Sequence, residues 1–161
     1  MKIITAQDSD LPAVKQIFKE YQDALNVSCC FSNFEQELAN LSTIYAPPAG
    51  GIFLAIEDKK VVACVAFRPM TESNKNSLSP KIAELKRLYV HDDYKGTGLG
   101  KKLFLQVMDA VKNNGYKAIV LETMDSMERA TAMYLKYGFK LSQDYSNNSN
   151  VDVKFYRFDF S

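Results

Sequence analysis

The chain contains few of the residues from which metal clusters and disulfide frameworks are built. Its 161 residues include no tryptophan, one histidine and three cysteines. The cysteines are Cys29, Cys30 and Cys64, which form no C-x-x-C pair, and the histidine is His91. Zinc sites need several such side chains at short spacings, and disulfide frameworks need an even set. We therefore expect reduced thiols, with Cys64 in the core of a hydrophobic strand, and no bound metal.

Long apolar runs and charge of one sign are also missing. No apolar run approaches the ~20 residues that span a membrane, and the N-terminal sequence MKIITAQDSD turns polar at once, unlike a signal peptide. Lysine and arginine number 20 against 19 aspartates and glutamates, a net charge of +1. Nucleic-acid binding usually leaves a basic footprint that this balance does not provide. We expect a cytoplasmic protein with no membrane and no nucleic-acid partner.

What the chain does contain is the composition of one globular domain. Hydrophobic residues make up 47% and charged residues 24% of the sequence, which is close to the average of soluble domains. A chain of this length can bury a core without disulfide or metal support. We therefore expect residues 1–161 to form a single domain.

Apolar periodicity and turn residues divide the chain into strands and helices. The predicted strands are residues 2–5, 52–56, 61–67, 82–90, 118–124, a short segment near Lys140, and 153–160. The predicted helices are residues 11–25, a second from Ser32 or Asn33 to about Thr43, a third between Gly98 and Gly115, and a fourth over 126–137. Strand 82–90, the third helix and strand 118–124 form a βαβ crossover, which makes these two strands parallel neighbours.

The most informative segment is Leu85–Leu103, with the sequence LKRLYVHDDYKGTGLGKKL. It runs from a strand through a polar turn into Gly96, Gly98 and Gly100, which open an amphipathic helix. The N–H groups and the positive dipole at a helix start attract phosphate oxygens, and glycine lets a ligand approach the backbone closely. The segment predicts a site for a phosphorylated cofactor; the alternative is a glycine-rich turn before an ordinary helix.

Two nucleotide-binding motifs fit this segment poorly. A dinucleotide fingerprint needs a third glycine where the chain has Lys101, although Glu122 loosely meets its second requirement of a later acidic residue. A Walker loop needs Ser or Thr after its lysine, but Gly100 is followed by Lys101 and Lys102. A nucleotide-binding domain is therefore the weaker alternative.

Two separated motifs resemble those of the GNAT superfamily of acetyl-CoA-dependent N-acetyltransferases. The segment Lys95–Gly100, KGTGLG, is similar to the family's pyrophosphate loop, with lysine in place of the usual glutamine or arginine at its start. The last helix carries the family pattern A-x-x-x-Y-x-x-x-G-F at Ala130, Tyr134, Gly138 and Phe139. The order of strands and helices resembles the family over essentially the whole chain.

The resemblance implies an α/β fold of the α+β type. Its central sheet is mixed and largely antiparallel, with six to seven strands, one parallel crossover and about four flanking helices, all within one N-acetyltransferase domain over residues 1–161. The implied cosubstrate is acetyl-CoA, with no metal. The residues expected to bind it are Leu88, Tyr89, Val90, Lys95, Gly96, Thr97, Gly98, Leu99, Gly100, Lys101 and Met127. Met127 stands where relatives often have asparagine.

The resemblance also gives candidate catalytic residues. Tyr134 is the candidate donor of a hydrogen bond or proton to the departing thiolate; the alternative is a core tyrosine. A carboxylate acts on the amine as base, directly or through water, and the two candidates are Glu84 and Glu122, with a slight preference for Glu84. Each could instead pair with Lys86 or Arg87. His91 is expected to be a solvated turn residue.

The expected partner is a primary amine on a small molecule, an amino acid or a peptide. The family's acceptor segments correspond to residues 26–34 and 145–152, which carry few clustered charges. Within the second of these segments, residues 145–150 are predicted to be an exposed turn. Relatives are often dimers, so a homodimer is one assembly that the resemblance allows. A catalytically silent module that binds acyl-CoA as a sensor is the alternative function.

Overall fold

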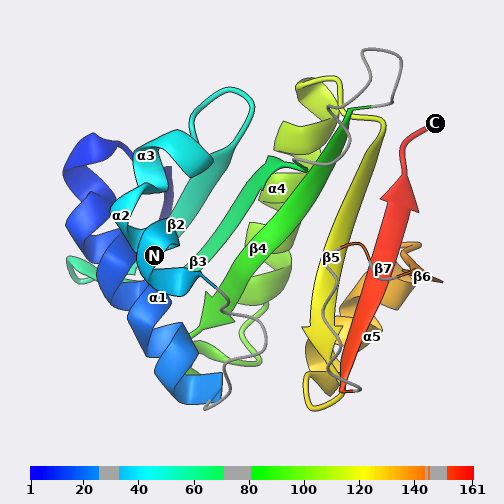
Figure 1. Ribbon diagram of the computed structural model, residues 1–161. Coiled ribbons are helices and arrows are strands. Elements are labelled where there is room, and N and C mark those ends of the chain that lie inside the picture. The colour runs from blue at the N-terminus through cyan, green and yellow to red at the C-terminus, as the bar shows by residue number, and fades with distance from the viewer. Residues whose placement is uncertain (26–32, 71–80, 144, 146–151) are drawn as a thin grey trace.

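A seven-stranded sheet forms the centre of the computed structural model, which describes residues 1–25, 33–70, 81–143, 145 and 152–161. The strand order is β1-β2-β3-β4-β5-β7-β6 (Figure 1). Among these strands only β4 and β5 pair in parallel. The predicted mixed sheet and its parallel crossover are confirmed. The strands are β1 (Lys2–Thr5), β2 (Gly51–Glu57), β3 (Lys60–Pro69), β4 (Ile82–Val90), β5 (Ala118–Met124), β6 (Lys140–Ser142) and β7 (Val153–Asp159).

Helices cover both faces of the sheet (Figure 1). One face carries α1, α2 and α3, and the other carries α4 and α5. Because successive strand residues point to opposite faces, β3 supplies Cys64 to the core under α1 and Val65 to the core under α4. The helices are α1 (Leu11–Leu25), α2 (Phe34–Ala39), α3 (Leu41–Ile44), α4 (Leu99–Asn113) and α5 (Glu128–Lys136), with short 3-10 turns η1 (Asp8–Asp10) and η3 (Asp92–Tyr94).

Two helix boundaries differ from the sequence prediction. The single helix predicted to run to about Thr43 is wrong, because the chain leaves the helical conformation at Asn40, where φ is −127°. The Asn40 side chain donates a hydrogen bond of 2.8 Å to the Gln36 carbonyl, a local bond that competes with helix continuation. The last helix begins at Glu128, two residues after the predicted Ser126, and no side chain caps it.

Strands β4 and β5 pair over only a short stretch. Their register joins Ile82–Glu84 to Ala118–Val120, although β4 continues to Val90 and β5 to Met124. Beyond that stretch the two strands diverge toward their carboxyl ends (Figure 1). Within the described ladder, the edge of β4 that faces β5 therefore has no strand partner after Glu84. Backbone donors and acceptors on that edge are available to a ligand.

An extra residue in β4 changes the direction of its side chains. Cys64 pairs with Tyr89, and Ala66 pairs with Lys86. The chain therefore advances by three residues on β4 where it advances by two residues on β3. This is a β-bulge, and Arg87 within it has a φ of 60°. As a result Tyr89 packs into the core under α1, whereas Leu88 packs on the α4 side.

A buried ion pair anchors this bulge. The Arg87 side chain donates to both oxygens of Glu37 on α2, with an Nε–Oε1 distance of 3.1 Å. The Tyr45 hydroxyl donates to the same carboxylate. Burial alone would raise the pKa of Glu37, but the hydrogen bond and charge of Arg87 outweigh it and lower that pKa. The Cys64 thiol donates to the Arg87 carbonyl at 3.2 Å, which confirms the predicted core position of Cys64.

Arg87→Met is expected to lower the free energy of unfolding by about 3 to 5 kcal/mol, because it leaves the Glu37 carboxylate buried without its cation. Urea unfolding followed by circular dichroism measures this loss. Since the folded pKa of Glu37 is lowered, the pair stabilises the fold above the unfolded pKa of the carboxyl, and this contribution is lost as the pH falls below it.

Arg157→Met is the matched control, because Arg157 and Asp159 form an exposed pair at 2.8 Å. Its expected cost is at most about 1 kcal/mol. Equal losses in Arg87→Met and Arg157→Met would contradict the anchoring role of the buried pair.

Candidate active site

A groove of about 710 Å³ runs between the carboxyl end of β4, the glycine loop and the start of α5. Its size lies within the usual range for small-molecule and cofactor sites. All of the residues expected from the sequence to bind the cofactor line this groove except Thr97. The Thr97 hydroxyl instead donates a hydrogen bond of 2.6 Å to the Tyr94 carbonyl, which closes the turn before the loop.

The glycine loop leaves its backbone open to the groove. Gly96 and Gly98 have φ values of 78° and 84°, and a side chain at either position would meet nothing within 4 Å. Gly98 is the N-cap of α4, so the N–H groups of the first helical turn have no partner inside the helix. Open space, free N–H groups and the positive helix end fit a pyrophosphate. The residues present therefore fit acetyl-CoA.

Lys95 lies at the mouth of this loop. Its ammonium contacts the Asp92 carboxylate at 2.5 Å, and the Lys95 side chain is 52% exposed. The hydrogen bond and charge of Lys95 lower the pKa of Asp92. Lys95 is therefore already paired with Asp92. Its ammonium is a single positive charge on a flexible side chain, whereas an arginine would present several hydrogen-bond donors in a rigid plane.

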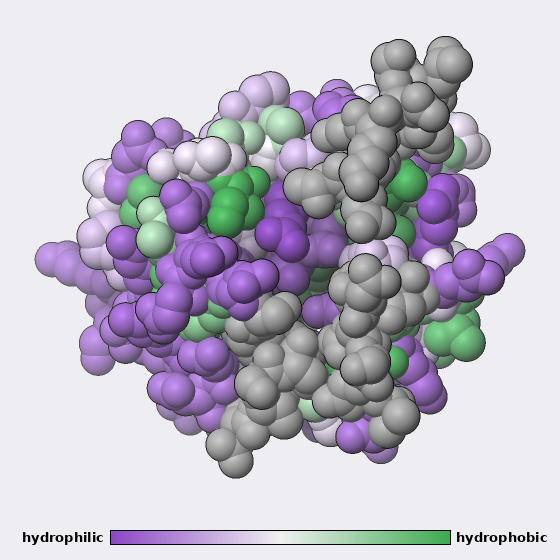
Figure 2. Space-filling model, viewed as in Figure 1, coloured by the Kyte–Doolittle hydropathy of each residue, from purple (hydrophilic) through white to green (hydrophobic). Residues whose placement is uncertain are grey.

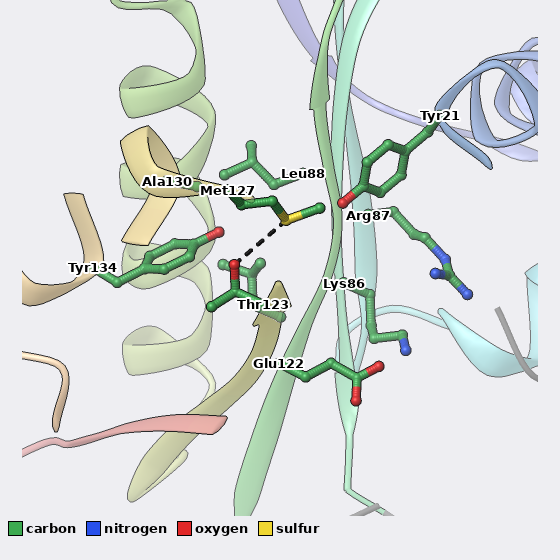
Figure 3. A pocket seen from close by; sticks show the side chains of 10 residues that line it. Tyr21, Lys86, Arg87, Leu88, Glu122, Thr123, Met127, Ala130 and Tyr134 are labelled. Carbon is green, nitrogen blue, oxygen red and sulfur yellow. Dashed lines mark hydrogen bonds between the residues drawn. The ribbon is translucent and has the colours of Figure 1, made fainter. Parts of the chain in front are cut away.

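A second, smaller cavity of about 50 Å³ lies where β4 and β5 diverge (Figure 3). The Tyr134 hydroxyl points into it from α5. The Tyr134 ring packs against Phe104 and Phe139 at 5.7 and 5.8 Å between centroids. Burial raises the pKa of Tyr134, so its hydroxyl keeps its proton and can donate it. Opposite, Thr123 donates to the Met127 sulfur at 3.4 Å.

The two candidate carboxylates occupy different environments. Glu122 lines the small cavity, together with Lys86 and Tyr134. Glu84 is buried beside it, and its Oε1 accepts from Arg68 at 3.1 and 3.3 Å and contacts the Lys86 ammonium at 3.4 Å. The pairing of Glu84 with Lys86, which the sequence left open as an alternative to a role as base, is present. Glu84 therefore has two cationic neighbours, and Glu122 shares its cavity with the tyrosine.

Tyr145 lies close to both carboxylates. Its hydroxyl is buried and has no hydrogen-bond partner among the described residues, and its ring packs edge-on against Phe155 at 5.0 Å. Burial, followed by the charges of Glu84 and Glu122, raises the pKa of Tyr145. The prediction of an exposed turn is therefore wrong at Tyr145, since its aromatic ring packs into a small core. Residues 146–150 of that prediction lie outside the described part of the chain.

The positions of one aromatic residue and of the histidine were not recognised from the sequence. Tyr21 belongs to the apolar stripe of α1, but it lines both cavities and stacks on Tyr89 at 5.1 Å. Helical spacing alone does not distinguish a core tyrosine from one that faces a cavity. His91 is not merely solvated: its Nε2 contacts Glu20 at 2.5 Å, and its ring meets Tyr89 edge-on at 5.6 Å.

The described residues contain no group of three or more histidine, cysteine, aspartate or glutamate side chains placed to hold a metal ion. None of the described helices has the length and apolar character needed to cross a membrane. Cys29 and Cys30, which were expected to be reduced thiols, and most of the acceptor segments lie outside the described part of the chain.

Comparisons with known proteins agree with this geometry. The Acetyltransferase (GNAT) family matches residues 12–139. An uncharacterized N-acetyltransferase of Schizosaccharomyces pombe is 31% identical over 153 residues, which cover 94% of this chain and 90% of that protein. The uncharacterized N-acetyltransferase YjgM of Escherichia coli is 28% identical over 142 residues, 87% of this chain and 81% of its own.

Solved structures share the fold. The structure of yncA from Salmonella typhimurium, a putative acetyltransferase with its cofactor acetyl-CoA, has a TM-score of 0.76 and 17% identity, over 99% of this chain and 93% of that one. The chain thus has the fold of this acetyltransferase structure. It belongs to the GNAT acetyltransferase family and is an acetyl-CoA-dependent N-acetyltransferase.

Gly98→Ala is expected to weaken coenzyme A binding about tenfold, because a left-handed residue other than glycine costs about 1 to 2 kcal/mol and its relaxation displaces the loop N–H groups. Isothermal titration calorimetry with coenzyme A measures this effect.

Gly115→Ala is the matched control. Gly115 has a φ of 77°, and a side chain there also meets nothing within 4 Å, but it follows α4 at the end away from the loop. We expect a similar loss of stability with unchanged coenzyme A affinity. Equal affinity losses in both variants would mean that the loop geometry does not determine binding.

Proposed function

We propose that this enzyme moves the acetyl group of acetyl-CoA directly to the primary amine of a small molecule, an amino acid or a peptide. One observation carries the proposal: the buried Tyr134 hydroxyl and Glu122 line the same small cavity, which adjoins the large groove. The two cavities share the lining residues Tyr21, Leu88, Met127 and Ala130. A group carried down the groove would therefore reach both side chains.

The groove residues have separate roles in this proposal. The backbone of Gly96–Lys101 holds the pyrophosphate at the start of α4, and Lys95 adds positive charge at the mouth. The open edge of Leu88–Val90 on β4 binds the pantetheine arm and donates to the thioester carbonyl. Such fixed donors stabilise the charge that develops on this oxygen during acyl transfer. Met127 packs along the arm where relatives often have asparagine.

Acetyl-CoA supplies an acetyl group on a thioester. Transfer forms the bond from the amine nitrogen to the acetyl carbon and breaks the bond from that carbon to sulfur. Glu122 accepts the proton that the amine loses, directly or through water, and Tyr134 gives a proton to the departing sulfur. We assign the base to Glu122 rather than Glu84 because Glu122 lines the cavity and Glu84 does not.

Tyr134→Phe is expected to lower kcat about 100-fold with little change in the KM for acetyl-CoA, because the thiolate loses its proton donor. Free thiol release, measured against a panel of amines, amino acids and peptides, tests this. Tyr116→Phe is the matched control, since Tyr116 is also buried but donates to the Ala49 carbonyl at 2.5 Å, and it lines neither cavity.

Acetyl-CoA binding by the wild type without thiol release for any amine would favour the alternative, a catalytically silent acyl-CoA sensor. Unchanged turnover in Tyr134→Phe would remove the assignment of that residue.

Glu122→Gln is expected to lower kcat about 100-fold and to abolish the fall in rate at low pH, because a carboxylate base loses function when it is protonated. The pH dependence of kcat measures this. Glu84→Gln keeps the shape of Glu84, and we expect it to retain the acid limb of the profile. Loss of that limb in Glu84→Gln alone would transfer the assignment to Glu84.

A further inference from the structure

The small cavity is flanked by a lysine whose charge is only partly compensated. The Lys86 side chain is 11% exposed. Among the described residues it makes a single ion pair, with Glu84 Oε1 at 3.4 Å, and no hydrogen bond. That same oxygen already accepts two hydrogen bonds from Arg68. One carboxylate therefore serves two cations, and this triad has an excess positive charge.

The alternation of side chains puts Glu122 on the same face of the sheet as this triad. Glu84 pairs with Val120 across β4 and β5, and two residues further along each strand are Lys86 and Glu122. Side chains two residues apart lie on the same face of a strand. Figure 3 shows Lys86 and Glu122 on the same side of the cavity, and no ion pair joins them. A positive and a negative group therefore both line the small cavity, on the same side of it.

The six charged residues described at and around the small cavity carry no net acidic charge. Arg68, Lys86 and Arg87 balance Glu37, Glu84 and Glu122, and strongly hydrophilic side chains lie at the centre of this face of the molecule (Figure 2). A polyamine or a lysine-rich tail needs an excess of carboxylates, which these residues do not supply. An acceptor that carries one positive and one negative group matches the charges of Glu122 and Lys86.

We infer that the acceptor is a primary amine that carries a carboxylate close to its nitrogen, an amino acid or an amino-acid derivative, and that Lys86, beside Arg68, binds this carboxylate. The inference rests on the proposed acetyl transfer. Glu122 faces the amine and Lys86 faces the carboxylate, so the two charges of the substrate orient its nitrogen toward the thioester. A buried ammonium with one long ion pair gains a short, charge-assisted hydrogen bond in this complex.

The test uses three conjugates that need no turnover. In each, the sulfur of coenzyme A is joined through a CH₂–CO link to the nitrogen of alanine, alaninamide or ethylamine. These differ only in the carboxylate. The wild type is expected to bind the alanine conjugate about tenfold more tightly than either of the others, as a charge-assisted hydrogen bond implies. Isothermal titration calorimetry measures the three affinities.

Lys86→Met is expected to reduce this preference to within about twofold, because the ammonium that binds the carboxylate is gone, and to leave the ethylamine conjugate unaffected. Lys86→Arg keeps the charge and is expected to keep the preference. Lys112→Met is the control, since Lys112 is exposed in the last turn of α4 and lines neither cavity. If Lys86→Met does not bind free coenzyme A, Lys86→Gln replaces it in the comparison.

Equal binding of the three conjugates by the wild type would overturn the inference, as would a preference that survives in Lys86→Met, or in Lys86→Gln where that variant replaces it. Either result leaves the proposed acetyl transfer intact if acetyl-CoA binds and amines release thiol. Failure of coenzyme A and all three conjugates to bind would instead reject the proposed function, and the inference with it. Thiol release that is faster with alaninamide than with alanine would also count against the carboxylate site.

Discussion

The divergence of β4 from β5 is the constraint on which the rest of this structure depends. Parallel pairing would normally continue along both strands, but here it ends after Ile82–Glu84. The free edge of β4, the small cavity and the inner end of the groove all occupy the space that this divergence opens. A continuous ladder would satisfy more backbone groups within the sheet, but it would leave no donor for a ligand. The proposed acetyl transfer therefore requires an incomplete sheet.

The cost of an interrupted strand is offset elsewhere in the fold. Arg87 adopts an uncommon backbone conformation in the bulge, and such residues persist only where the surroundings hold them. Its guanidinium is held by Glu37, its carbonyl accepts from Cys64, and Phe34 lies beneath it at 5.4 Å. Three elements, α2, β3 and β4, therefore cooperate to fix one peptide next to the cavity.

Local patterns predicted much of this architecture. Strand alternation, helical periodicity and the glycines of Gly96–Gly100 depend on residues close in the sequence, and the corresponding elements are present. The missed features depend on interactions between residues distant in the sequence, such as the ion pair of Glu37 with Arg87, or the effect of the charges of Glu84 and Glu122 on the pKa of Tyr145. No spacing rule reports such contacts, and the excess charge beside Lys86 emerges only once Arg68 is seen to share Glu84.

The shared wall between the two cavities has a thermodynamic consequence. Tyr21, Leu88, Met127 and Ala130 line both the groove and the small cavity. A ligand that moves any of these side chains therefore alters the neighbouring site as well as its own. Thermodynamic linkage then makes the effect reciprocal. If the first ligand changes the affinity for the second by some factor, the second changes the affinity for the first by the same factor. The affinities of the two sites for their ligands are thus coupled through the positions of four side chains.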